Sequence, residues 1–350
     1  MSSTTPATHA SGLISEAPGP AGDVAPDRRG RTGRFTHAQL LSIPPVALFV
    51  VLFVVMVVLE GTFSGSVLET VLETTIPLIL VGFGQTLVIL TGGIDLSIGG
   101  VFALTTGLLA TRATHNSDIG LWVPLVILIG LAAGALNGVL IVRTKMQPFI
   151  VTLASWSVFD GLALIVLPTD GGSIAPGLSS GLSGSLGIPK GVIITVLAIL
   201  VWLAIRRTRF GTHTLAIGSS EASATLNGVP VARTKIIIYA LSGLFAALGA
   251  IYYSSVLTFS GSPTSGDPFI LQSVAAVVIG GASLAGGRGN VVGTILGACS
   301  LSMIAQIVFF AGAQSYWSQV FQGALILAAV LLFATVELLI RRRNPVDEEV

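Results

Sequence analysis

The chain has 350 residues, of which 52% are hydrophobic and only 9% are charged, and its mean hydropathy is +0.90. Soluble globular domains carry roughly a quarter charged residues, so this composition excludes a soluble enzyme and indicates an integral membrane protein. The 17 basic residues nearly balance the 16 acidic residues, which leaves no basic surface for nucleic acid. The single cysteine, Cys299, excludes a disulfide framework, and the four histidines lack metal-ligand spacing.

The N-terminal segment, residues 1–38, is rich in Pro, Gly, Ala, Ser and Thr and includes a cluster of arginines between positions 28 and 34. Such a segment buries too little apolar surface to become ordered, so we expect a disordered tail. No small-residue cleavage site follows the first apolar run, and that run is therefore expected to stay as a membrane anchor.

From Ile43 onward the sequence contains apolar segments comparable in length to the ~20 residues that cross a bilayer. They cover approximately residues 43–60, 67–91, 94–111, 121–142, 149–167, 189–205, 236–257, 270–286, 290–312 and 317–340. This pattern predicts an all-α, polytopic membrane protein with about ten transmembrane helices in a domain over 39–340. The second and third segments are separated only by a glycine-containing break, and the eighth ends in glycines. We expect broken or re-entrant spans at these places.

The basic residues test this topology independently, because cytoplasmic loops are enriched in Lys and Arg. With the N-terminus in the cytoplasm, every basic residue except Arg112 and Lys190 falls on the cytoplasmic side. The densest group frames the loop 206–235. The prediction is a multi-pass protein of the plasma membrane with both termini in the cytoplasm, including a C-terminal tail over 341–350.

The two glycine-rich breaks form a weak internal repeat. The string GGIDLSIGG at 92–100 resembles GGASLAGG at 280–287 with one residue deleted. Glycine-interrupted segments at corresponding places are typical of transporters that arose by duplication, so the repeat predicts two related halves. Chance similarity between glycine-rich strings is the alternative.

No catalytic motif accompanies these segments. The sequence lacks HExxH, GxSxG, a spaced carboxylate pair and a Walker A loop, so we do not expect an enzyme or a cofactor in this chain. If transport uses ATP, the ATP and Mg²⁺ must bind to another chain.

Ionisable residues within the apolar segments are functional candidates, because they are costly there. Asp95 follows two glycines and could cap the third helix or line a permeation path. Asp160 lies in the middle of its segment and could form an interior hydrogen bond or face the path. Glu73 lies near the outer end of its segment, and we interpret it as a hydrated structural residue. Asn137 and Gln85 could be interhelical hydrogen-bond partners or path-lining groups.

The loop 206–235 contains a predicted short helix. Ser219 or Ser220 could cap its start, and Gly228 could end it. From the residues alone, this element is either a surface helix with basic flanks or a docking element for a cytoplasmic partner.

Several motifs occur in a recognisable order. They are TGGIDLS at 91–97, Asn137-Gly138 followed by QPFIVTL at 147–153, the segment from Glu221 and Ala222 to Gly228, and AAVVIGGASLAGGRG at 275–289. From Ile76 to Leu332 the chain resembles the membrane permease subunits of ribose-type (monosaccharide) ATP-binding-cassette importers, within the wider group that includes branched-chain amino-acid permeases. The motif residues carrying this resemblance are Gly92, Gly93, Asp95, Ser97, Gly280, Gly281, Gly286 and Gly287.

The resemblance implies roles for the loop and for other chains. Glu221, Ala222, Leu226 and Gly228 would form the coupling helix that docks on a cytoplasmic ATPase subunit. An extracytoplasmic sugar-binding protein would deliver the solute, and two copies of the permease would pair as a homodimer within the membrane lipid.

The chain also departs from the family pattern. Asp160 precedes Gly161 where many such sugar permeases carry an arginine, and residues 267–274 lack the acidic-Leu-Asp pattern of ribose permeases. Other substrates, such as amino acids, nucleosides or autoinducer-like solutes, therefore remain alternatives. A secondary transporter is a further alternative, and it would use Asp95, Asp160 or Glu73 as its ion site.

Overall fold

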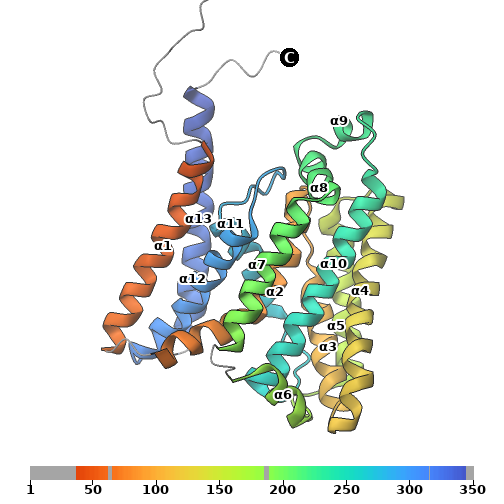
Figure 1. The fold of residues 1–350 in the computed structure, drawn as a ribbon, viewed down its shortest axis with the longest axis vertical. Helices are drawn as coiled ribbons and strands as arrows, with labels where there is room; N and C mark the ends of the chain where they lie inside the picture. The colour runs from red at the N-terminus through yellow and green to blue at the C-terminus, as the bar shows by residue number, and fades with distance from the viewer. Residues whose placement is uncertain (1–36, 62–64, 185–188, 315, 344–350) are drawn as a thin grey trace, which may run out of the picture. The chain divides into compact units, whose positions relative to one another are not determined.

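A computed structural model describes residues 37–61, 65–184, 189–314 and 316–343 of the chain. Over these ranges the structure is helical, with one isolated β-bridge between Gly171 and Gly261. The helices are α1 (His37–Glu60), α2 (Gly65–Leu90), α3 (Ser97–Arg112), η1 (Asn116–Asp118), α4 (Ile119–Thr144), α5 (Pro148–Val166), α6 (Pro176–Leu182), α7 (Lys190–Arg206), α8 (Arg209–Ser219), α9 (Glu221–Leu226), α10 (Val231–Tyr252), the π-helical η2 (Tyr253–Thr258), α11 (Asp267–Ile279), α12 (Val291–Phe310) and α13 (Tyr316–Arg343) (Figure 1). The all-α prediction is confirmed.

The predicted tails differ slightly from the helix bounds. Residues 1–36 of the expected N-terminal tail lie outside the described residues, but α1 already begins at His37, so positions 37 and 38 are helical. At the other end α13 continues to Arg343, so the first three residues of the predicted tail 341–350 are also helical, and 344–350 lie outside the described residues.

Each predicted apolar segment coincides with a helix, but the helices differ in their ability to cross a bilayer. Among the described residues, five helices are long and apolar enough, and α7 with α8 forms a sixth span if that pair, bent by 77°, is taken as one. The chain is thus a polytopic membrane protein, while the number ten stays a prediction.

Two of the predicted spans are short helices followed or preceded by a loop. The third predicted segment is the 16-residue α3, and the eighth is the 13-residue α11, which ends at Ile279 rather than at 286. At a rise of 1.5 Å per residue these helices are only about 24 Å and 20 Å long, against a hydrocarbon core of roughly 30 Å. The expectation of incomplete spans at these two places agrees with these lengths.

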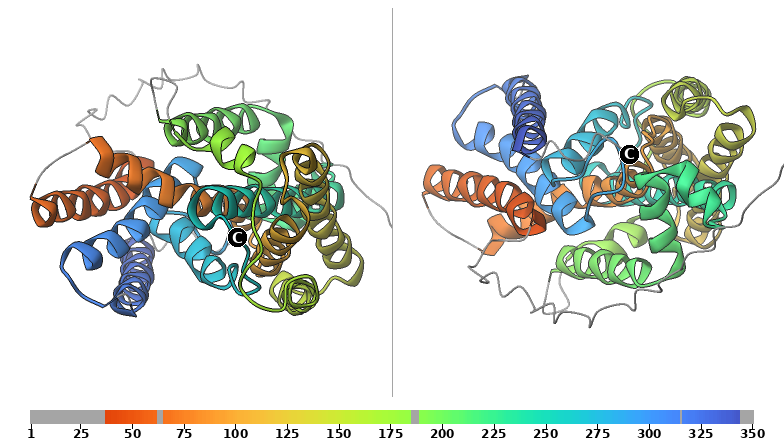
Figure 2. Two further views of the ribbon diagram at one scale, coloured as in Figure 1. Left: turned by 90° about the horizontal axis from the view of Figure 1, so that it is seen from below. Right: turned by 90° about the horizontal axis from the view of Figure 1, so that it is seen from above.

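Helix α2 forms the centre of the helical core. Every residue from Thr75 to Leu90 is buried, and α10, α12, α11 and α7 all pack against this helix (Figure 2). Small residues allow close packing elsewhere in the core. On α4, Gly130 lies directly against Gly243 of α10, which brings the two backbones into contact in the way that lipid-embedded helices use glycine.

The breaks after α2 and α11 begin with the same helix-end structure. After α2, Gly92 has a φ of +75°, and the N–H of the next residue donates to the carbonyl of Val88 at 3.2 Å. After α11, Gly281 has a φ of +87°, and the N–H of the next residue donates to the carbonyl of Val277 at 3.1 Å. Both are Schellman ends. They align Gly92 with Gly281, whereas the sequence repeat paired Gly92 with Gly280, so the repeat is shifted by one residue at its start.

Beyond these helix ends the two breaks diverge. The first loop, residues 91–96, is short, and Gly99 and Gly100 already lie inside α3. The second loop, residues 280–290, is longer, and its Gly286 and Gly287 stay outside any helix with φ values of +92° and +73°. The later glycine pairs of the sequence repeat are therefore not structurally equivalent.

Candidate functional site

Asp95 is fully buried in the first loop and is hydrogen-bonded on both carboxylate oxygens. Oδ1 accepts the backbone N–H of Ser97 at 3.0 Å and its hydroxyl at 2.6 Å, and Oδ2 accepts the hydroxyl of Ser242 in α10 at 2.7 Å. A buried polar group left without partners costs about 1–3 kcal/mol, and more if it is charged. These bonds therefore fasten the start of α3 to α10.

Asn137 extends this network to two further helices. Its side-chain NH₂ donates to the Ser97 hydroxyl at 2.7 Å, and its carbonyl oxygen accepts the hydroxyl of Ser155 in α5. The hydroxyl of Thr152 donates to the Ile94 carbonyl at 3.1 Å, which anchors the first loop a second time. The interpretation of Asn137 as an interhelical partner is confirmed. We call Asp95, Ser97, Asn137, Ser155 and Ser242 the polar network.

The predicted capping role of Asp95 is partly correct. The carboxylate does accept the first backbone N–H of α3, that of Ser97, but the N-cap residue is Leu96, and Asp95 lies one position earlier. The aspartate forms an Asx-type turn to the residue two positions ahead. It closes the helix start while its other oxygen reaches α10.

Gln85 is the counterexample within α2. The side chain is fully buried, and among the described residues neither its oxygen nor its nitrogen has a hydrogen-bond partner. The interpretation as an interhelical hydrogen-bond partner is therefore wrong for Gln85, although it holds for Asn137. Gln85 lies one helical turn before Ile89, whose side chain packs with Val277 of α11. This position places an unpaired amide on the α2 face toward α11.

Two further unpaired groups occur on consecutive turns of α5. Asp160 has one buried carboxylate oxygen, and Trp156 has a buried indole N–H, and neither atom has a hydrogen-bond partner within the described part of the chain. Helix α5 packs against α3 here, since the backbone at Asp160 lies against Gly100. An acceptor and a donor four residues apart thus share one region of α5. Glu73, in contrast, is only partly buried near the start of α2.

The predicted short helix in the loop 206–235 is present as α9. Ser220 caps it by accepting the Ser223 N–H at 3.2 Å, and Gly228 ends it with a φ of +77°. Helix α8, which precedes α9 and turns away from α7 by 77°, is not among the predicted elements. Only Ser220 separates α8 from α9.

The surface of α9 combines a fixed charge with an unpacked apolar side chain. Glu221 forms an ion pair with Lys235 at the start of α10, with a Nζ–Oε2 distance of 2.6 Å. Leu226 is 88% exposed, although it ends the helix, and Ala222 is also exposed. An exposed leucine on a short helix whose two ends are capped is typical of a docking contact.

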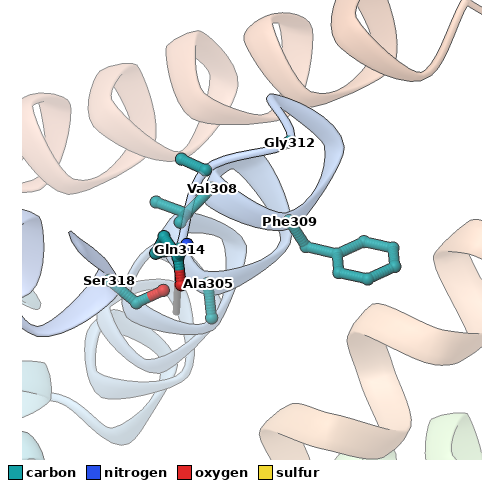
Figure 3. A pocket seen from close by; sticks show the side chains of 7 residues that line it. Ala305, Val308, Phe309, Gly312, Gln314 and Ser318 are labelled. Atoms are coloured by element: carbon teal, nitrogen blue, oxygen red, sulfur yellow. The ribbon is translucent and has the colours of Figure 1, made fainter. Parts of the chain in front are cut away.

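A surface pocket of about 480 Å³ lies at the turn between α12 and α13. Figure 3 shows Gln314 and Ser318 on one side of it and the Phe309 ring directed away from them. None of the predicted path residues lines this pocket, so it adds nothing to the candidate path.

Residues 67–330 match a family of proteins described as "Branched-chain amino acid transport system / permease component". The chain belongs to this permease family. It is a permease subunit of the ATP-binding-cassette class, and so the non-catalytic, membrane-spanning component of a transport system.

Relatives of the permease are named for the import of different sugars. The chain is 41% identical to the ribose import permease of Bacillus subtilis (strain 168) over 261 residues, which cover 72% of this chain and 80% of that protein. It is 35% identical to the ribose import permease of Escherichia coli (strain K12) over 72% of this chain and 81% of that protein. It is 35% identical to the fructose import permease of Bifidobacterium longum (strain NCC 2705), over 73% and 78%. No solved structure shows a significant match.

Some residues of the site were not found by reading the sequence. Ser242 and Ser155 complete the polar network, yet a serine in an apolar helix is too common to signal a partnership. Trp156 gives no sequence signal for its unpaired N–H either. Only the packing of α3, α4, α5 and α10 reveals these contacts.

Proposed function

We propose that the permease forms the membrane path of an ATP-binding-cassette importer for a monosaccharide. A cytoplasmic ATPase subunit would bind ATP and Mg²⁺, and an extracytoplasmic binding protein would deliver the sugar. The observation that carries the proposal is α9, a short helix capped at both ends and unpacked at Leu226, in a chain of this family. The names of the ribose and fructose relatives support a sugar as the solute.

The orientation follows from the charges around α8 and α9. Arg206, Arg207, Arg209 and Arg233 are all exposed in this region. Because basic residues accumulate in cytoplasmic loops, we place α8 and α9 in the cytoplasm, with both chain termini on the same side of the plasma membrane.

Docking on the ATPase would use the exposed part of α9. Leu226 would enter an apolar site on the partner, while Ala222 allows close approach. Glu221 and Gly228 hold the helix in place, the first through its ion pair with Lys235 and the second through the turn that ends the helix. Since each chain offers one such segment and an importer of this class closes two ATPase subunits, we propose that two copies of the permease pair as a homodimer.

The path would use polar groups that lack partners in this conformation. Gln85, Asp160 and the Trp156 N–H offer both donors and acceptors, which is the pairing that sugar hydroxyl groups require. Asp95 and Asn137 are already satisfied by the polar network, and we assign them to holding the path-forming helices rather than to the solute.

The direct test is transport by the reconstituted system. Proteoliposomes that contain the permease, its ATPase and its binding protein should take up ribose or fructose. Uptake should require ATP on the side of the membrane where the ATPase is bound. Permease alone should move no sugar. Uptake by the permease alone, driven by a proton or sodium gradient, would contradict the proposal.

Asp160 distinguishes the importer from an ion-coupled secondary transporter. In a secondary transporter Asp160→Asn should abolish gradient-driven uptake, because the ion site would lose its charge. In the importer the same change should alter ATP-driven uptake without abolishing it. Trp156→Phe is the companion variant, which removes the N–H donor but keeps an aromatic ring at that position.

A further inference from the structure

Backbone from three distant segments meets at one point beside the coupling region. The segments are the C-terminal end of α8, the first loop at Gly92 and the second loop at Gly286 and Gly287. A Cβ atom on Gly218 would collide with the carbonyl oxygen of Leu90 and the backbone nitrogen of Gly287. We call Gly92, Gly218, Gly286 and Gly287 the glycine junction.

The contacts within the glycine junction are mutual. The Gly287 N–H donates to the Leu90 carbonyl at 3.0 Å, which ties the second loop to the end of α2. A Cβ on Gly286 would lie 2.8 Å from the Gly92 nitrogen and 3.0 Å from the Gly218 oxygen. With no side chain between the segments, none of them can shift by a fraction of an ångström without moving its neighbours.

The glycine junction connects α9 to the two short spans, α3 and α11. Ser220 alone joins α8 to α9, while the two loops lead directly into α3 and out of α11. At its other end α9 continues through residues 227–230 into α10, and Glu221 pairs with Lys235 of that helix, whose side chain is only 15% exposed. This second connection leads to α10 alone, so the route from α9 to the two loops runs through α8.

We infer that α8, the first loop and the second loop move as one body. The glycine junction would then transmit a displacement of α9 to α3 and α11. This inference rests on the proposed docking of the ATPase on α9. It assigns Gly218 a positioning role, because the close approach of three backbones requires a residue without a side chain there.

The first experiment is Gly218→Ala in the permease reconstituted with its ATPase and binding protein. The ATPase should still co-purify at the wild-type yield, because the exposed surface of α9 is unchanged. Sugar uptake per ATP hydrolysed should fall by about ten-fold, within the range found for residues along a coupling route. Gly120→Ala is the matched control, since nothing lies within 4 Å of a Cβ at that helical position. Wild-type coupling in Gly218→Ala would overturn the inference.

A reversible disulfide cross-link provides a second test, in which the reduced form of the same variant is the reference. A Cβ on Gly287 would lie 3.0 Å from the Ser219 hydroxyl oxygen, so cysteines at these positions can form a disulfide once Cys299 is replaced by serine. If the segments move together, oxidation should leave uptake at the level of the reduced protein. Uptake that stops on oxidation and returns on reduction would show sliding and overturn the inference, as would failure of the disulfide to form.

The wild-type reference keeps the two proposals apart. If the wild-type permease neither binds an ATPase nor takes up sugar with ATP, the proposed function fails before any variant is compared. If the wild type works and only the junction variants behave unexpectedly, the proposed function stands and the transmission through Gly218 fails.

Discussion

The loops after α2 and α11 begin with the same Schellman end but are held in different ways. The first loop is fixed by side chains, since Asp95 and Thr152 connect it to α10 and α5. The second loop is fixed by backbone contacts through Gly286 and Gly287. Both loops share the backbone contacts of the glycine junction, but only the first is also tied to α5 and α10 by side chains.

The largest effect should come from Asp95→Ala. The change leaves the hydroxyl groups of Ser97 and Ser242 without their acceptor and should lower stability by about 2–5 kcal/mol. Thermal unfolding of the purified permease in detergent measures the loss. Ser283→Ala is the control in the second loop, because the Ser283 side chain is only partly buried and its loss should change stability by less than about 0.5 kcal/mol. Equal losses at both positions would contradict the comparison of the loops.

Leu226→Ser tests α9, the proposed docking helix, from which contacts lead through α8 to the second loop. Losing an apolar docking anchor should weaken ATPase binding by about ten-fold, as expected for roughly 1.4 kcal/mol. Unfolding temperature should stay at the wild-type value, since the side chain is 88% exposed. Affinity is measured by titrating the ATPase onto the reconstituted permease. Leu226→Met keeps the apolar volume and should bind normally, and a Ser variant that binds equally well would remove α9 as the docking helix.

Gln85→Leu should show the opposite sign on stability. The wild-type amide is buried without partners, so its removal should stabilise the permease by about 1–2 kcal/mol while sugar uptake falls. Asn137→Leu is the matched change of an amide that is satisfied within the polar network, and it should destabilise the protein instead. Unfolding and uptake measured side by side decide the matter. A destabilised Gln85→Leu variant would mean that the amide is paired in the membrane.

The smallest effect concerns Asp118, a partly exposed carboxylate just before α4. The backbone N–H of His115 donates to it at 3.0 Å and holds the pKa of Asp118 below its ordinary value. A carboxyl with a lowered pKa stabilises the fold above the ordinary aspartate pKa, and this contribution is lost as the pH falls through the lowered value. Asp118→Asn should therefore unfold slightly earlier at neutral pH. The difference should vanish in acid, and a difference that persists there would exclude this cause.

Local sequence signals predicted a large part of the structure. Apolar length located the helices, and the Ser220 and Gly228 pattern located α9, because caps and left-handed glycines act within a few residues. The amides of Gln85 and Asn137 could not be told apart in the same way. Each lies in an apolar helix, and only the neighbours that tertiary packing supplies make one paired and the other unpaired.

The sequence by itself determined that the chain is a polytopic, helical membrane protein, since 9% charged residues cannot cover a soluble core. Its motifs also determined the family. The tertiary structure decided which glycines act as turns, which meet other backbones, and that α8 touches the end of α2 and the second loop. The reason is physical: hydropathy and capping depend on residues near in sequence, whereas the contact of Gly218 with Leu90 and Gly287 joins segments far apart in the chain.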